Sequence, residues 1–301
     1  MKIFSYKEPP FFQKEFNGYK LKTHQFQKAE DIYGMWDNCS PEEADYIFVP
    51  FIFYANSISP DIDEVAMKFF TEQLKWFNQF PEKHIILDIS DLDLPCKCLA
   101  QSIVFKTSAN IRYHDIYSLP YYTQPIRYAP PVTSAIYDLC FQGSLATHPI
   151  RKEMAKWVPT WAEYKVNFIE NDLQFWSFNK DKQAVLQSSF KQQIKDSVFV
   201  LCPRGRALNS VRFFETLSCG RIPILITDAA KLPLESIIDY SKFCVFIPEG
   251  YCRWIPDFIK DFLERNSIVE ASKIARNVYD TYFDPSQFRN LLTATINFER
   301  K

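Results

Sequence analysis

The sequence predicts an α/β protein of two domains, each built on a parallel sheet. Short apolar runs that suit buried strands alternate with segments of helical spacing in both halves of the chain, the order typical of parallel strands joined by crossover helices. The length of 301 residues suits two domains rather than one. Residues 117–132 include four prolines and predict an extended connector between the two halves.

The first half is expected to hold five strands and one helix. The strands are predicted at residues 2–4, 46–51, 84–87, 103–106 and 111–113, and the helix at residues 63–80. The second half is expected to hold five more strands, at residues 137–142, 165–169, 198–201, 222–226 and 243–247. Its helices are predicted from residue 149 and at residues 183–194, 210–219, 255–262, 268–282 and 285–301. Asn209 or Ser210 suits the cap of the helix at 210–219, and Gly220 suits its C-terminal end.

Charge and composition exclude several classes of partner. The formal net charge of −1 gives no reason to expect nucleic acid or an anionic membrane surface. Neither a signal-peptide core nor an apolar run of membrane-spanning length is present in the sequence, so we expect a soluble, cytoplasmic protein. The eight cysteines form no CxxC pair, which favours reduced thiols. Cys96 and Cys98 with His84 match no common zinc spacing, and no metal site is predicted.

Residues 196–228 have the pattern of strand, loop, helix and strand, and we interpret them as the active-site half. The loop at 202–209 carries Arg204 and Arg206, and a helix begins directly after it. A cationic loop leading into a helix N-terminus is suited to phosphate, because the loop supplies charge and the helix supplies free N–H groups.

Arg212 supports this interpretation. A cation in the first turn of a helix opposes the helix dipole and costs about 0.3–1 kcal/mol. An ion pair with Glu215 is the structural alternative, but it contributes only about 0.2–0.5 kcal/mol. The sequence lacks GxxxxGK[ST] and GxGxxG, so a P-loop or dinucleotide site is disfavoured. We expect a nucleotide sugar, with its pyrophosphate at Arg204, Ser210 and the helix N–H groups and its ribose hydroxyls at Glu215.

Four segments, ordered along the chain, form a larger pattern: PEEADYIFVPF (41–51), CFQGSLATHPIRKEM (140–154), CPRGRALNSVRFFETLSCGRIPILITD (202–228) and FCVFIPE (243–249). Together they resemble the exostosin-type family of glycosyltransferases, family 47. EKHIILDISD (82–91) stands where that family has a Gly-Arg-Asp-His element, with His84 and Asp88 as loose counterparts.

The resemblance implies a GT-B fold, with two Rossmann-like α/β domains facing each other across a cleft. It implies inverting transfer of a sugar from a UDP-sugar donor to a hydroxyl of an oligosaccharide or glycan acceptor. With the connector, it predicts an acceptor-side domain over residues 1–132, a donor domain over residues 133–275 and a C-terminal helix over residues 276–301, packed back on the first domain. The donor-site residues that it implies are Gly143, Arg151, Arg204, Ser210, Arg212 and Glu215. No cofactor or metal is implied, since GT-B enzymes generally stabilise the leaving diphosphate with cations and a helix dipole. Eukaryotic members commonly carry a membrane anchor and disulfides, so a bacterial or viral type is expected.

A base that deprotonates the acceptor is expected on the first domain. Its candidates are Asp88, Asp91, Asp93, His114 and Asp115. Capping and turn formation is the alternative explanation for each. Two other functions are compatible with the sequence: a catalytically silent nucleotide- or glycan-binding protein on the same fold, and a sugar-nucleotide epimerase, against which the missing glycine-rich fingerprint argues. The sugar is open among xylose, galactose, glucuronate and N-acetylglucosamine.

Overall fold

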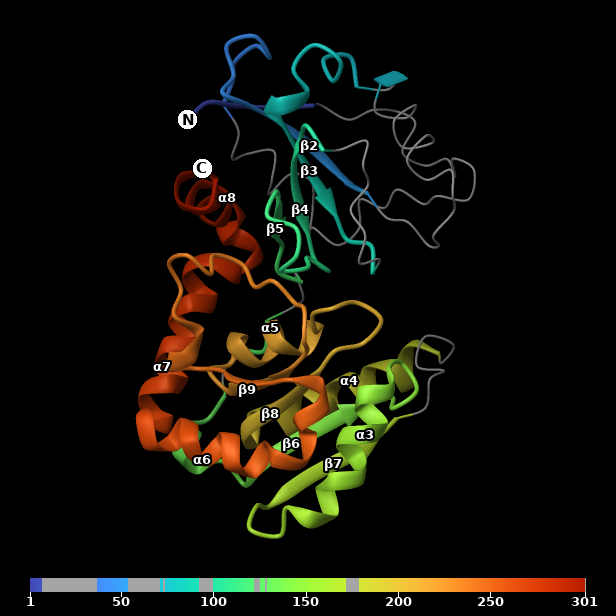
Figure 1. The fold of residues 1–301 in the computed structure, drawn as a ribbon, viewed down its shortest axis with the longest axis vertical. Coiled ribbons are helices and arrows are strands. Elements are labelled where there is room, and N and C mark those ends of the chain that lie inside the picture. The colour runs from blue at the N-terminus through green and yellow to red at the C-terminus, as the bar shows by residue number, and fades with distance from the viewer. Residues whose placement is uncertain are drawn as a thin grey trace. The chain divides into compact units, whose positions relative to one another are not determined.

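The structure, a computed structural model, describes residues 1–6, 37–53, 71–72, 74–91, 100–121, 125–127, 129–171 and 179–300. Within these ranges the chain divides into two units (Figure 1). The first unit comprises Met1–Pro120, Ala229–Leu234 and Thr295–Arg300. The second comprises Tyr121–Asp228 and Glu235–Ala294.

The first unit holds a five-stranded sheet in the order β1-β2-β3-β4-β5, in which every neighbouring pair is parallel. Its elements are β1 (Ile3–Ser5), β2 (Tyr46–Phe53), the 3-10 helix η1 (Pro81–Lys83), β3 (His84–Asp88), β4 (Ile103–Lys106) and β5 (Ile116–Ser118). Both β3 and β4 are buried along their whole length, as is usual for central parallel strands.

Two predictions for the first half disagree with the structure. The strand predicted at residues 111–113 is wrong, because these residues form a turn. Strand β5 lies instead inside the segment that was predicted to be a connector, where the following prolines masked a short run of strand-forming residues. Of the helix predicted at 63–80, only residues 71–72 and 74–80 are among the described residues.

The second unit holds a second five-stranded sheet, in the order β10-β9-β8-β6-β7, again parallel throughout. Its strands are β6 (Tyr137–Gly143), β7 (Val166–Glu170), β8 (Ser197–Pro203), β9 (Ile222–Ile226) and β10 (Val245–Ile247). The two parallel sheets confirm the predicted α/β class.

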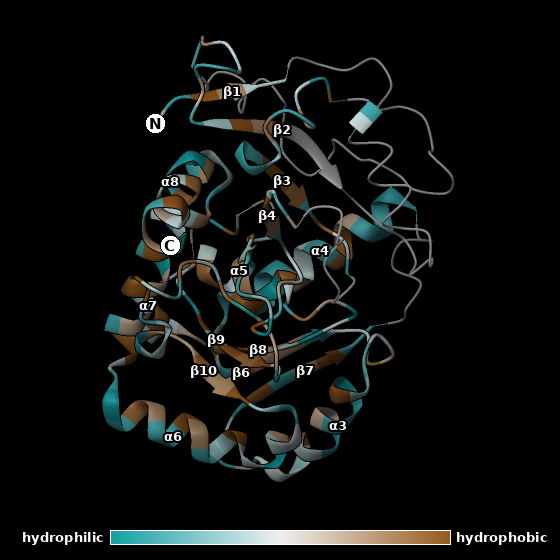
Figure 2. Ribbon diagram, turned by 45° about the horizontal axis from the view of Figure 1, so that its top comes forward, coloured by the Kyte–Doolittle hydropathy of each residue, from teal (hydrophilic) through white to brown (hydrophobic). Residues whose placement is uncertain are grey.

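Helices accompany this second sheet. The α-helices are α3 (Pro149–Trp157), α4 (Lys180–Lys195), α5 (Val211–Ser218), α6 (Ile255–Arg265), α7 (Ile268–Val278) and α8 (Phe288–Phe298). The shorter helices are η3 (Val132–Ser134), η4 (Val158–Thr160), η6 (Tyr240–Lys242), η7 (Glu249–Trp254), η8 (Tyr279–Phe283) and η9 (Pro285–Gln287). Figure 2 shows α4 and α5 on one face of the sheet and α3 and α6 on the other, so the apolar strands are covered on both sides.

The segment from β8 to β9 forms as predicted. Ser210 is the N-cap of α5, and Gly220 follows its end with a φ of +66°, a conformation that glycine adopts without strain. A Cβ at this glycine would also approach the carbonyl oxygen of Ser272 to 3.1 Å. The short turn therefore needs glycine for two reasons.

The order of strands in the second sheet identifies where a ligand would bind. Strand β6 pairs with β7 on one side and with β8 on the other, so the connections that follow β6 and β8 leave the sheet in opposite directions. In open parallel sheets such a switch point leaves a crevice at the carboxyl ends of the two strands, and ligands bind there.

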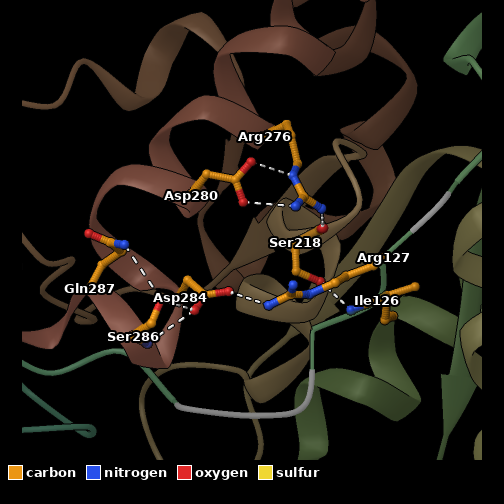
Figure 3. A network of polar contacts seen from close by, with 8 residues as sticks. All are labelled: Ile126, Arg127, Ser218, Arg276, Asp280, Asp284, Ser286 and Gln287. Carbon is orange, nitrogen blue, oxygen red and sulfur yellow. Dashed lines mark hydrogen bonds and ion pairs between the residues drawn. The ribbon is translucent and has the colours of Figure 1, made fainter. Parts of the chain in front are cut away.

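Polar contacts fasten the C-terminal end of α5 to its surroundings (Figure 3). The Ser218 hydroxyl accepts a hydrogen bond from the Ile126 N–H at 2.8 Å, and the Ser218 carbonyl accepts one from Arg276 on α7. Next to Ile126, Arg127 forms an ion pair with Asp284 at 3.0 Å. Two residues of the predicted connector, Ile126 and Arg127, are thus bonded to Ser218 and Asp284 of the second unit.

Candidate functional site

One arginine, Arg151, links the loops that follow the carboxyl ends of β6 and β8. Arg151, in the first turn of α3, donates from Nη1 to the carbonyl of Ser144, just after β6, at 3.0 Å. Its Nε donates to the carbonyl of Arg204, just after β8, also at 3.0 Å. Arg151 therefore fixes the distance between the two loops of the switch point.

Arg212 ties the same two strands together from α5. Its guanidinium donates to the carbonyl of Gln142 on β6 at 2.5 Å and to that of Leu201 on β8 at 3.5 Å. The guanidinium carbon also lies 4.6 Å from the ring centre of Phe141 and 5.4 Å from that of Phe190. Arg212 is buried, so it acts on the site mainly through the backbone and through its charge.

Gly143 leaves room for the guanidinium of Arg212 at the end of β6. A Cβ at this position would lie 2.8 Å from Nη2 of Arg212 and 3.7 Å from Nη1 of Arg151. The first distance is shorter than any normal contact, so a side chain here would displace Arg212. The glycine is therefore needed for the close approach of the Arg212 guanidinium to the end of β6, whereas the contact with Arg151 would be an ordinary one.

The two positive charges lack a carboxylate partner. Among the described residues, no Asp or Glu lies within ion-pair distance of Arg151 or Arg212. Burial lowers the pKa of both side chains, and Arg212 lowers that of Arg151 further. Arginine nevertheless keeps its proton in proteins. The lowered pKa thus reflects the cost of burying these charges, which the more distant Glu215 offsets only in part for Arg212, and an anion bound at this edge would offset it further.

Arg204 is the arginine that the loop presents. Its side chain is 19% exposed and its Nη1 lies 3.5 Å from Oε1 of Glu249. Its Nη2 donates to the carbonyl of Arg206 at 3.4 Å, while its Nε is buried without a partner. Arg206 itself is exposed. Arg204 therefore has an unused hydrogen-bonding direction at the switch point.

The N-terminus of α5 begins beside this loop. Ser210 is in the extended conformation of an N-cap, but its side chain makes no capping hydrogen bond. Its N–H is held by Oδ1 of Asn209 at 2.8 Å, and the amide nitrogen of Asn209 is buried without a partner. The start of the helix therefore leaves polar groups that a ligand can satisfy.

Glu215 lies one turn further along α5 and is half-buried. Burial raises its pKa to about 6, although Arg212 and Lys191 oppose this shift. Arg212 and Glu215 form no ion pair, so an ion pair between them does not explain why an arginine lies in the first turn of α5.

Sequence reasoning missed two residues of this edge. Glu249 ends the FCVFIPE segment and directly follows β10, so its position at the end of a strand was a usable signal. Phe141, whose ring lies near both Arg212 and Arg151, gave no signal, because a phenylalanine inside a strand usually fills the core.

The candidate bases in the first unit differ in their surroundings. Asp88 ends β3 and accepts a hydrogen bond at 2.5 Å from Lys106, and both side chains are almost completely buried. The other oxygen of Asp88 accepts the N–H of Ser90 at 2.8 Å. This geometry favours the structural explanation for Asp88. Three other candidates are exposed: Asp91, His114 and Asp115. Asp93 lies outside the described residues.

His84 is not free to act as a metal ligand. Its ring nitrogens contact the carbonyl of Phe80 at 2.7 Å and the hydroxyl of Tyr6 at 2.9 Å, and burial lowers its pKa. Cys96 and Cys98 lie outside the described residues. Within the described ranges there is no cluster of three or more His, Cys, Asp or Glu side chains with the geometry of a metal site. The cysteines in those ranges are free thiols.

Two Rossmann-like α/β units, the second with a cationic edge at its switch point, define the class of GT-B glycosyltransferases. The chain belongs to the family described as the Exostosin GT47 domain, whose family model matches residues 1–257. None of the described helices is long and apolar enough to cross a bilayer.

Curated relatives match part of the chain. The Exostosin-1 homolog of Caenorhabditis elegans is 34% identical over 133 residues, which cover 43% of this chain and 35% of the relative. Exostosin-1 of Drosophila melanogaster is 34% identical over 112 residues, which cover 37% of this chain and 15% of the relative. The match thus spans about a third or less of the length of these relatives.

Solved structures are similar only in general shape. The lipopolysaccharide outer core galactosyltransferase WaaB has a TM-score of 0.46 at 11% identity, covering 84% of this chain and 76% of that chain. A glycosyltransferase from Rickettsia africae has a TM-score of 0.42 at 9% identity, covering 83% and 89%. Neither similarity bears on the substrate.

Proposed function

We propose that this chain transfers a sugar from a UDP-sugar to a hydroxyl of an oligosaccharide or glycan acceptor, with inversion at the anomeric carbon. Membership of the GT47 family supports glycosyl transfer. The observation that carries the nucleotide-sugar donor is a pair of arginines at a topological switch point, the buried Arg212 and the partly buried Arg151, neither of which has a described carboxylate within ion-pair distance.

In this proposal the donor diphosphate binds at the loop after β8. Arg204 donates to the phosphate oxygens from its free Nε and from Nη1, and Ser210 and the first N–H groups of α5 donate as well. Arg151 and Arg212 hold the two loops and add positive charge. Glu215 accepts hydrogen bonds from the ribose hydroxyls.

The chemical step is a single displacement. A base on the first unit takes the proton of the acceptor hydroxyl, the oxygen forms a bond to the anomeric carbon, and the bond from that carbon to the phosphate oxygen breaks. UDP leaves with the bonding electrons, and the arginines and the helix N-terminus stabilise its charge. The proposal needs no metal or cofactor. The candidates for the base are Asp91, Asp93, His114 and Asp115. Asp88 is the least favourable candidate, because its carboxylate already accepts a hydrogen bond from Lys106.

Replacing Arg204 with alanine is expected to weaken UDP binding by about tenfold to a hundredfold, because charge-assisted hydrogen bonds to phosphate contribute about 1.5–3 kcal/mol. Calorimetric titration with UDP measures the effect. Arg206→Ala is the matched control, since Arg206 is an exposed arginine of the same loop and is expected to change the affinity little. Equal losses in the two variants would mean that only the general positive charge of the loop matters. A wild-type protein that does not bind UDP would contradict the proposed function.

A catalytically silent binding protein is the second candidate function. It would bind UDP at the same site but would release none from UDP-xylose, UDP-galactose, UDP-glucuronate or UDP-N-acetylglucosamine in the presence of glycan acceptors. Release of UDP from one of these donors, together with loss of that release in Arg204→Ala, supports the transferase. The same panel identifies the sugar.

UDP affinity is expected to fall as the pH drops below about 6, because Glu215 then becomes protonated and accepts hydrogen bonds less well. Folding stability depends on pH in the opposite direction to UDP affinity, because the folded state favours the protonated form of Glu215. Glu215 stabilises the fold fully below its unfolded pKa of about 4.3, and this contribution is lost as the pH rises through about 6, by at most about 2 kcal/mol. Glu215→Gln should remove the stability dependence and the part of the affinity dependence that is due to Glu215, and the dependence that remains in this variant is that of the phosphate of UDP itself. Identical pH profiles in the two proteins would exclude this role of Glu215.

A further inference from the structure

The ion pair between Arg204 and Glu249 engages the guanidinium group to which, in the proposed function, the donor diphosphate binds. Nη1 of Arg204 lies 3.5 Å from Oε1 of Glu249, and the two side chains are 19% and 21% exposed. Among the described residues, Glu249 is the one carboxylate in ion-pair contact with the arginines of this edge, since Arg151 and Arg212 have none.

The fold fixes Glu249 at this place. Its backbone N–H donates to Oδ1 of Asp228 at 2.8 Å. Asp228 follows β9, and Glu249 opens η7 directly after β10, so both residues belong to the carboxyl edge of the sheet. The carboxylate of Glu249 is therefore held near Arg204 by the backbone and not by the ion pair alone.

The pair is weak compared with what a phosphate offers. Glu249 contacts one guanidinium nitrogen at a long distance, and Nε of Arg204 is left without a partner. Partly exposed ion pairs contribute little to stability, whereas phosphate binds arginine through two parallel hydrogen bonds. A diphosphate can displace Glu249, but it then lies close to a carboxylate of like charge.

We infer that Glu249 is an internal competitor of the nucleotide: its carboxylate holds Arg204 in the empty site, weakens the binding of the diphosphate, and thereby speeds the release of UDP after transfer. This inference rests on the proposed function. Product release limits the turnover of many enzymes. A site with three arginines and no opposing charge would retain UDP for longer, and Glu249 limits that retention.

Replacing Glu249 with glutamine tests the inference, because it keeps the shape of the side chain and removes its charge. Calorimetry with inorganic pyrophosphate and with UDP is expected to give about tenfold tighter binding of both to Glu249→Gln, and stopped-flow measurement should give slower dissociation of UDP. Uridine, which carries no phosphate, is expected to bind both proteins equally. Glu249→Ser, which keeps the backbone contact to Asp228, should change affinity in the same direction.

Two controls identify the cause of the change. Glu153→Gln removes a carboxylate that accepts hydrogen bonds from Lys156 and Trp157 of its own helix, and it should leave UDP binding unchanged. In an Arg204→Ala background, Glu249→Gln should no longer tighten the binding of pyrophosphate, because the group for which Glu249 competes is gone.

The possible failures are distinguishable. If Glu249→Gln binds UDP more weakly while pyrophosphate binding is unchanged, Glu249 is a ligand of the ribose, and the inference is overturned while the proposed function stands. Unchanged affinities for both ligands overturn the inference in the same way. If the wild-type protein binds neither UDP nor pyrophosphate, the proposed function fails first.

Discussion

Replacing Lys106 with methionine is expected to lower the free energy of unfolding by about 3–5 kcal/mol, measured by chemical denaturation at neutral pH. The ammonium group of Lys106 contacts Asp88 at 2.5 Å and the Ser90 hydroxyl at 2.7 Å, and its side chain is 1% exposed. Its removal leaves the carboxylate of Asp88 buried without a counter-charge.

Two further variants make this result specific. Lys242→Met, at an exposed position, should leave stability within about 0.5 kcal/mol of the wild type. The double variant Asp88→Asn with Lys106→Met should recover part of the lost stability, because no charge is then buried. A stable, folded Asp88→Asn protein that binds UDP but transfers no sugar would instead make Asp88 the base.

Replacing Gly143 with alanine is expected to lower the free energy of unfolding by about 1–3 kcal/mol and to weaken UDP binding at least tenfold. The added Cβ would lie 2.8 Å from Nη2 of Arg212. Nη2 donates to the carbonyl of Gln142 and Nη1 to that of Leu201, so the guanidinium cannot move aside without weakening these bonds. Thermal denaturation measures the first effect, and calorimetric titration with UDP measures the second.

Gly250→Ala is the matched control for this variant. A Cβ at Gly250 would meet no atom within 4 Å, so alanine there is expected to leave stability and UDP affinity nearly unchanged. If Gly143→Ala behaves like Gly250→Ala, the close approach of Arg212 to β6 is not needed for the donor site.

Local patterns in the sequence were sufficient to predict most of the second unit. Strand β9 spans the predicted residues 222–226, and α5 differs from its predicted span by one residue at each end. These elements have strong apolar periodicity, a capping residue and a terminal glycine, all of which act over a few residues. The first unit was less predictable, since β5 has three residues and is followed closely by prolines.

The order of the strands and the partners of the charged residues could not be predicted in this way. The placement of β8 next to β6, which creates the switch point, depends on pairing between segments more than fifty residues apart. The sequence offered an ion pair with Glu215 as the alternative to an anion site for Arg212, and neither explanation anticipated that the guanidinium contacts backbone carbonyls of two strands. Such contacts are set by tertiary packing, and no spacing along the chain encodes them.

The charges of Arg151 and Arg212, which have no carboxylate within ion-pair distance in the described part of the chain, also bear on how long the protein survives in a cell. A protein that holds uncompensated charge in its empty form gains stability when a ligand supplies the missing anion, by an amount that grows with ligand concentration. Degradation acts on the transiently unfolded fraction. With the nucleotide sugar that we propose as donor, we therefore expect molecules without donor to be degraded sooner than molecules supplied with it, so that the supply of donor affects the amount of the protein as well as its rate.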